Sequence, residues 1–265
     1  MRIAAFNARR FGIKKCTNEE VFKIITRIAL RYDIIVILEV FDSKEKAAKL
    51  LTDKLNSCAK GGHYQYLLSK PLGRGEYREQ YLFIYRDDVV QVKETYQYED
   101  NQEGDVDAFA REPFVVRFKS KQTALKDFAL IPVHTTPLDS VKEIDELYDV
   151  FLAVKEKWKM QRVMILGDFN AEGSYVSKKK MKTLRLRQDT RFHWLICDEK
   201  DTTAGKTTDY CYDRIVVHDD MLEGIVPNSA TPFNFQEKYD LTDEETLAVS
   251  DHYPVEVELK PRAKK

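Results

Sequence analysis

The chain has 265 residues, a length that favours one large domain or two small ones and is enough to bury a sizeable core. Lys and Arg number 43 against 44 Asp and Glu, so the net charge is −1 and excludes a strongly basic surface over the whole molecule. Any contact with nucleic acid must therefore come from a local basic face. Because no apolar run approaches the ~20 residues of a membrane-spanning helix, we expect no membrane contact.

Short β-branched or aromatic runs predict strands, and apolar residues at helical spacing predict three helices. In chain order we expect strand 3–6, helix 18–32, strand 34–40, helix 44–57, strands 81–85, 114–118 and 128–133, helix 139–159, and strands 163–166, 212–217 and 255–259. Thr17 and Ser140 each begin a capping-box pattern, with a glutamate three positions later. Many strands with few long helices predict an α+β fold in which helices cover two packed sheets.

Neither an internal repeat nor a low-complexity linker divides the chain. We therefore expect a single catalytic domain over residues 1–260, followed by a basic tail over 261–265. The cysteines show no CxxC spacing and are typical of free thiols in a reducing compartment. They are Cys16, Cys58, Cys197 and Cys211.

Polar residues stand at the ends of these predicted strands. Glu39 follows the apolar run 34–38, where a desolvated carboxylate is costly unless it is paired or binds a metal. Alone, each such residue is more typical of a turn, a cap or a satisfied surface side chain. Together they favour a hard cation with oxygen ligands beside two proton-transfer groups. The strand-end residues are Asn7, Glu39, His134, Asp168 and Asn170, with Asp251 and His252 before the last strand.

Phosphodiester hydrolysis needs a cation at the phosphate, a base for the attacking water and an acid for the departing 3′ oxygen. A histidine in either proton-transfer role needs a carboxylate on its second ring nitrogen, which fixes the tautomer and raises its basicity. Glu79, within Tyr77–Tyr81, and Asp213, within Tyr212–Arg214, are candidate partners.

These segments together resemble the deoxyribonuclease I family of the endonuclease/exonuclease/phosphatase superfamily, over nearly the whole chain. The GDFN segment at 167–170 and the SDH segment at 250–252 occur across the superfamily. The REPF, HTTP and YDRI segments, at 111–114, 134–137 and 212–215, are specific to deoxyribonuclease I-like enzymes. The residues around His134 are most similar to those of the gamma-like branch. The resemblance implies a four-layer α/β/β/α sandwich of two mixed sheets flanked by helices, with the active site at one edge of the sheets.

The resemblance also implies a role for each site residue. His134 would pair with Glu79 and His252 with Asp213, and which histidine is the base stays open. Asp168 and Asn170 would complete the catalytic set. The ligands of an active-site Mg²⁺ (or Mn²⁺) would be Glu39, Asn7, Asp251 and Asp168.

Contacts with DNA, through phosphates and the minor groove, would come from Arg111, Tyr77, Asn170 and Tyr175. Family members also bind structural Ca²⁺, and the matching positions are Asp107 and Glu112 at one site and Asp201 and Thr203 at another. Residues 201–203 are also compatible with a simple polar turn.

The chain departs from the family pattern in three places, one of which is the loop 101–105, where it lacks the cysteines of a second, small disulfide of pancreatic-type enzymes. Gly173 and Tyr210 stand where the family has the two cysteines of a structural disulfide, so that bond is absent. Phe41 stands where pancreatic-type enzymes insert an arginine into the minor groove. The missing disulfide, together with a Met1 directly before the first strand, favours an intracellular enzyme of the cytoplasm or nucleus; the alternative is a secreted enzyme whose leader has been removed.

The sequence thus predicts a monomeric, divalent-metal-dependent endonuclease that hydrolyses DNA. One alternative is a superfamily phosphodiesterase or phosphatase acting on a phosphoinositide, a sphingolipid or abasic DNA, against which the REPF and HTTP segments argue. The other is a catalytically inactive relative that binds actin or DNA. The sequence leaves open whether actin is a partner and whether chromatin or naked DNA is preferred.

Overall fold

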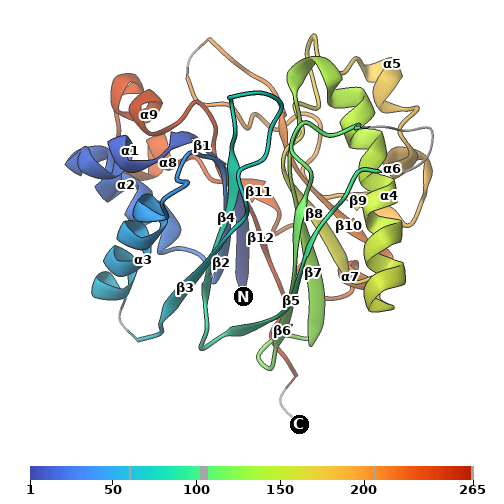
Figure 1. Cartoon of the computed structure of the whole chain (residues 1–265), viewed down its shortest axis with the longest axis horizontal. Helices are drawn as coiled ribbons and strands as arrows, with labels where there is room; N and C mark the ends of the chain where they lie inside the picture. The colour runs from blue at the N-terminus through green and yellow to red at the C-terminus, as the bar shows by residue number, and fades with distance from the viewer. Residues whose placement is uncertain (60, 102–106, 206, 264–265) are drawn as a thin grey trace.

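Two sheets pack face to face, and helices cover the outer face of each (Figure 1). This architecture comes from a computed structural model, which describes residues 1–59, 61–101, 107–205 and 207–263. Within these residues each sheet has six strands and is mixed. The predicted four-layer α/β/β/α sandwich is therefore confirmed.

The first sheet has the strand order β11-β12-β1-β2-β4-β3, in which only β1 and β2 run parallel among the described pairs. Its strands are β1 (Arg2–Phe11), β2 (Ile34–Val40), β3 (Tyr64–Leu68), β4 (Gln80–Arg86), β11 (Thr231–Pro232) and β12 (Val255–Glu258). The helices on its outer side are α1 (Ile13–Thr17), α2 (Glu19–Ala29), α3 (Lys46–Cys58), α8 (Phe235–Tyr239) and α9 (Asp243–Val249) (Figure 1).

The second sheet has the order β5-β6-β7-β8-β10-β9, and here β7 and β8 form the parallel pair. Its strands are β5 (Val90–Gln97), β6 (Phe114–Ser120), β7 (Asp127–His134), β8 (Val163–Asp168), β9 (Phe192–Trp194) and β10 (Asp213–His218). Long helix α4 (Ser140–Trp158) covers its outer face with the short helices α5 (Lys178–Met181) and α6 (Arg185–Gln188), while α7 (Asp219–Leu222) follows β10 (Figure 1).

Alternation along the strands divides the core into three layers. On β2, Ile34 and Val36 lie between the two sheets, whereas Ile35 and Ile37 pack against the helices of the first sheet. All four are buried, and full burial of one such side chain stabilises the fold by roughly 1.5–3 kcal/mol. A strand buried on both faces explains why this segment reads as one uninterrupted apolar run.

Both predicted capping boxes are wrong, because each helix begins at a different residue. Asn18 caps α2 through its side-chain oxygen, since Thr17 still belongs to α1. A 3-10 turn precedes α4, and the Ser140 hydroxyl donates to the carbonyl oxygen of Thr136 at 3.0 Å instead of capping the helix. A capping box that the sequence analysis missed, between Thr242 and Glu245, starts α9.

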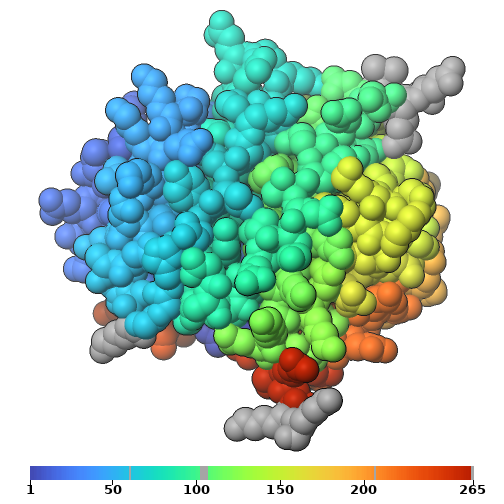
Figure 2. Space-filling view, turned by 60° about the horizontal axis from the view of Figure 1, so that its bottom comes forward, coloured from blue at the N-terminus to red at the C-terminus, as the bar shows by residue number. Residues whose placement is uncertain are grey.

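Part of the predicted C-terminal tail packs against the connection between β6 and β7. Pro261 forms a β-bridge with Thr123, and the Arg262 backbone N–H donates to the carbonyl oxygen of Gln122 at 2.8 Å. Figure 2 shows this red segment next to green residues from the middle of the chain. Residues 264 and 265 lie outside the described residues. In the described ranges, no helix has both the length and the apolar composition to cross a bilayer.

Candidate active site

Three neighbouring strands of the second sheet bring a row of polar side chains to one edge. His134 at the end of β7 is in register with Asp168 on β8, and Asp168 is in register with Asp213 on β10. Gly167 makes this row possible, because its φ is +140° and a Cβ there would lie 2.1 Å from the Val133 carbonyl oxygen.

The first sheet contributes a matching row at the same edge. Asn7 lies on β1, Glu39 on β2 and Glu79 immediately before β4. Glu39 has a φ of +54°, in the left-handed region that costs a residue other than glycine roughly 1–3 kcal/mol. Two donors hold its carboxylate: Asn7 Nδ2 at 3.0 Å and the Arg10 backbone N–H at 3.1 Å.

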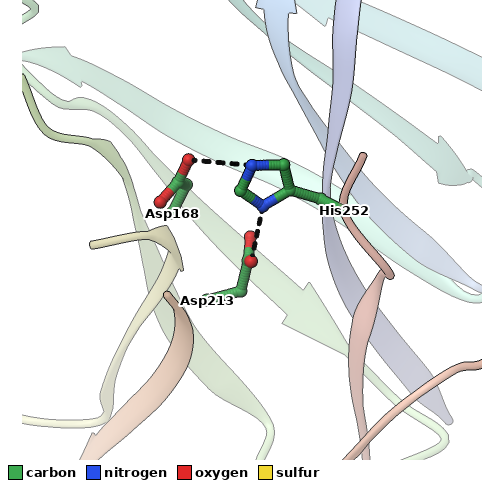
Figure 3. A group of neighbouring side chains, drawn as sticks. All are labelled: Asp168, Asp213 and His252. Carbon is green, nitrogen blue, oxygen red and sulfur yellow. Dashed lines mark hydrogen bonds and ion pairs between the residues drawn. The ribbon is translucent and has the colours of Figure 1, made fainter. Parts of the chain in front are cut away.

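The two rows are joined by histidine–carboxylate pairs that cross between the sheets. His134 Nδ1 lies 2.7 Å from Glu79 Oε2, and His252 Nδ1 lies 2.7 Å from Asp213 Oδ2. Both carboxylates are buried, so water does not compete for these contacts. Figure 3 shows the second pair beside Asp168.

Asp168 lies between the two pairs. Its Oδ2 atom is 3.6 Å from His134 Nε2 and 3.7 Å from His252 Nε2 (Figure 3 shows the contact with His252). Burial alone would raise the pKa of Asp168, but the two imidazoles and the N–H groups of Asn170 and Asn7 lower it below its ordinary value. The anionic Asp168 carboxylate thus faces the Nε2 atom of each imidazole, whereas Glu79 and Asp213 bind the Nδ1 atoms on the opposite side of the rings.

Both imidazoles bind a proton more readily than in water. Burial lowers the pKa of His252, but the charges of Asp213 and Asp168 outweigh it and raise that pKa well above the ordinary value. Burial and the Arg111 charge likewise lower the pKa of His134, and the hydrogen bond and charge of Glu79 reverse the direction, so the net shift is upward. Each histidine therefore has the environment of a proton-transfer group.

Comparison with known proteins gives the family. Residues 4–252 match the model of the endonuclease/exonuclease/phosphatase family. Human deoxyribonuclease gamma is 49% identical over 262 residues, covering 98% of this chain and 86% of the human protein. Rabbit (Oryctolagus cuniculus) deoxyribonuclease-1 is 50% identical over 261 residues, covering 98% of this chain and 92% of the rabbit protein. The chain belongs to the deoxyribonuclease I family.

More distant solved structures share the fold alone. An endonuclease/exonuclease/phosphatase family protein from Bacteroides thetaiotaomicron superposes with a TM-score of 0.66 at 16% identity, covering 100% of this chain and 98% of that one. A mannosyl-6-phosphatase of the same organism gives 0.62 at 15% identity, covering 98% and 99%. The sandwich of the deoxyribonuclease I family is therefore common to proteins whose sequences have diverged widely.

The predicted metal ligands of this deoxyribonuclease I family member divide into two groups. Glu39 and Asp168 lie together, because Asn7 Nδ2 donates to both, at 3.0 and 3.1 Å. Asn7 thus turns its amide nitrogen toward the carboxylates, and its oxygen accepts the Arg9 backbone N–H. The Asp251 side chain is 46% exposed and lies 3.8 Å from Arg9. Among the described residues, the His, Cys, Asp and Glu atoms close enough to share an ion belong to Asp168, Asp213 and His252.

The predicted DNA-binding residues lie on both sides of the two pairs. Tyr77 is 49% exposed and meets Phe41 edge to face at 5.1 Å. Arg111 is buried, and its Nε donates to the His134 carbonyl oxygen at 2.9 Å. Asn170 has a φ of +46°, and its amide nitrogen donates to the Thr135 carbonyl oxygen; Tyr175 packs beside Tyr212 at 5.6 Å.

The two predicted calcium positions differ in whether their predicted ligand residues contact each other. Asp201 Oδ1 accepts both the backbone N–H and the hydroxyl of Thr203, at 2.9 and 2.7 Å, which is also the geometry of the simple polar turn. The Asp107 carboxylate instead pairs with Arg74 Nε at 3.2 Å. The Glu112 backbone carbonyl oxygen accepts a hydrogen bond from Gln97 Nε2 at 2.9 Å.

Three residues that the sequence analysis missed hold the two histidine–carboxylate pairs in place. The Tyr81 hydroxyl oxygen accepts a hydrogen bond from the His134 backbone N–H at 3.2 Å. The Thr202 hydroxyl oxygen accepts one from the Asp213 backbone N–H at 3.0 Å. The Ser250 hydroxyl donates to the Asn7 carbonyl oxygen at 2.6 Å and accepts the His252 backbone N–H at 3.1 Å. Only the position of Ser250 beside His252 could have indicated such a role from sequence.

Proposed function

We propose that this chain is a divalent-metal-dependent deoxyribonuclease that hydrolyses phosphodiester bonds within DNA. The observation that carries the proposal is the convergence of two imidazole Nε2 atoms on one carboxylate oxygen of Asp168, while a buried carboxylate holds each Nδ1. Relatives at 49% and 50% identity, named deoxyribonuclease gamma and deoxyribonuclease-1, support DNA as the substrate.

Each histidine has one free direction for proton transfer. With Nδ1–H donating to Glu79 or Asp213, Nε2 of the neutral ring accepts a proton and Nε2 of the charged ring donates one. One histidine takes the proton of a water whose oxygen attacks phosphorus. As the bond from phosphorus to the 3′ oxygen breaks, the other histidine gives that oxygen a proton. The products are a 5′-phosphate and a 3′-hydroxyl, and the order of the two histidines is left open.

The carboxylates at this edge suit a hard cation. Glu39 and Asp168 offer adjacent oxygens, and Asp251 and Asn7 are the further proposed ligands of Mg²⁺ or Mn²⁺. Asn7 would have to turn its amide oxygen toward the ion in place of the nitrogen that now donates to the carboxylates. Such an ion neutralises phosphate charge during hydrolysis. The proposed structural Ca²⁺ ligands remain Asp107 and Glu112 at one site and Asp201 and Thr203 at the other.

A local basic face supports contact with the DNA backbone. Arg9, Arg10, Lys14 and Lys15 line one groove together with Phe41, and Arg10 also bonds Glu39 through its backbone. The near-neutral chain thus gathers positive charge beside its candidate active site, where phosphate contacts fix the position of DNA. Arg111, Tyr77, Asn170 and Tyr175 are the proposed contacts nearer the histidines.

A supercoiled-plasmid assay tests the proposal. With Mg²⁺ present we expect nicked and then linear DNA, and excess EDTA should abolish the nicking. Activity that survives EDTA undiminished would remove the metal from the mechanism. Release of phosphate from an inositol phosphate without plasmid nicking would favour the other superfamily chemistry.

We further propose that the enzyme acts as a monomer in a reducing compartment, the cytoplasm or nucleus. All four cysteines are free, two of them buried and two exposed. Free exposed thiols persist where glutathione and thioredoxin keep them reduced.

A further inference from the structure

Three tyrosines form a layered cluster beside one of the candidate catalytic histidines. The Tyr210 and Tyr212 rings are nearly parallel, at 10° and 5.0 Å between centroids, and Tyr175 packs on Tyr212 at 5.6 Å. The Tyr212 ring in turn lies 6.3 Å from the His252 ring. We call Tyr175, Tyr210 and Tyr212 the tyrosine stack.

Tyr210 is fixed although it lies at the surface. The Thr202 backbone N–H donates to its carbonyl oxygen at 2.9 Å, and its own N–H donates to Asp201 Oδ1 at 3.2 Å. The edge of its ring covers Gly173, where a Cβ would lie 3.1 Å from Tyr210 Cε1. The Tyr210 ring is therefore packed on the backbone of Gly173.

The position of the ring offers more than packing. Tyr210 is 37% exposed, and the Tyr212 ring lies nearly parallel to it. On the opposite side of the site, Tyr77 and Phe41 meet at 67° and form no such parallel pair. Within the tyrosine stack, Tyr210 and Tyr212 therefore form a parallel aromatic pair beside the candidate active site, and backbone hydrogen bonds hold Tyr210 in place.

A nucleobase stacks on such a surface only when its own faces are free. Bases inside a duplex are covered on both sides by their neighbours, whereas those in a single strand, a gap or an unwound segment are open to an aromatic ring. Stacking of this kind tolerates any base, because every base has a π-face.

We propose that Tyr210 stacks an unpaired nucleobase next to the scissile bond and so raises the activity of this enzyme on single-stranded and locally unpaired DNA relative to duplex DNA. The inference rests on the proposed deoxyribonuclease function. It gives Tyr210 a role in specificity and none in proton transfer.

The test compares end-labelled single-stranded DNA with a duplex of the same sequence. For Tyr210→Ala we expect the ratio of kcat/KM on the single strand to kcat/KM on the duplex to fall about tenfold, within the usual effect of removing one stacking aromatic. Tyr210→Phe should keep the wild-type ratio. Tyr210→Leu, which still covers Gly173, should behave like the alanine variant. Tyr66→Leu, on edge strand β3 of the other sheet, is the matched control and should not change the ratio.

A second measurement removes the base instead of the ring. An abasic nucleotide moved stepwise along the single strand should lower wild-type cleavage at one fixed distance from the scissile bond, and it should cause no further loss in Tyr210→Ala. A leucine variant with the wild-type ratio, or equal losses on both substrates, would reduce Tyr210 to a packing residue and overturn the inference. Failure of the wild-type chain to cut either substrate would instead refute the proposed function. If the alanine variant does not fold, the comparison of phenylalanine with leucine decides the question.

Discussion

Removal of the two central histidines should have equal and overlapping effects on turnover. His134→Ala and His252→Ala should each lower kcat by ~10²–10⁴-fold, the usual contribution of a positioned acid or base. Because both Nε2 atoms face the same Asp168 oxygen, at 3.6 and 3.7 Å, we expect the two histidines to act on one reacting phosphate. The double variant should therefore be little slower than either single variant, since residues that act as a unit lose their contribution together.

Stability should fall much less than activity. Each substitution leaves a buried carboxylate, Glu79 or Asp213, without its hydrogen-bond partner at 2.7 Å. That costs ~1–3 kcal/mol, or roughly 2–12 °C in melting temperature for a chain of this size, against a typical total stability of ~5–15 kcal/mol. His63, whose Nδ1 lies 2.9 Å from Asp87 at an exposed site, supplies a matched control in which His63→Ala should change neither quantity noticeably.

Plasmid nicking and melting curves on the same preparations measure both effects. A single variant that keeps more than about a tenth of wild-type turnover would remove that histidine from proton transfer. Losses that multiply in the double variant would show that the two pairs act independently, contrary to the shared position of Asp168.

Three other outcomes follow from individual contacts. Phe41→Arg should sharpen the pattern of cut sites on sequenced DNA, because groove contacts specify sequence while phosphate contacts only position the protein; an unchanged pattern would contradict this. Since all four cysteines are free, dithiothreitol should leave the melting temperature unchanged, and a fall of several degrees would reveal a disulfide. Buried His218 stacks on Phe151 at 5.1 Å, and burial lowers its pKa below the ordinary 6.5. As the pH falls below 6.5, the unfolded chain therefore takes up a proton at this residue before the folded chain does, and the free energy of unfolding decreases. His218→Phe should lessen this decline in melting curves between about pH 7 and pH 5, where His titrates; an equal decline in both proteins would refute it.

The site was predictable wherever a chemically distinctive residue stands at a strand end. Glu39, His134 and Asp168 each follow an apolar run, so a pattern of period two or an unbroken run locates them at the edge of a sheet. No such sequence pattern marks Tyr81 and Thr202, whose hydroxyl groups bind the backbone of His134 and Asp213. Tyr81 and Thr202 act through backbone groups 53 and 11 positions away, and only the folded chain brings those groups together.

The helix starts failed for a related reason. The Ser140 pattern satisfies the local rule for a capping box, but the preceding 3-10 turn takes the Ser140 hydroxyl, and Glu143 accepts the backbone N–H of Thr136 instead, at 3.0 Å. A pattern of four residues contains no information about the turn before it. The longer helices and most strands were predictable because their periodicity extends over several turns or pleats.

The crossing of the two pairs between sheets has a consequence for the newly made protein. Glu79 and His252 lie shortly before strands β4 and β12 of the first sheet, and His134 and Asp213 lie on strands of the second, so docking of the two sheets brings each pair together. A ribosome delivers the chain from the N-terminus, and His252 emerges after every other residue named in the two pairs. A nascent chain shorter than this point holds at most one complete pair. We therefore expect no nuclease activity from a nascent chain that ends before His252.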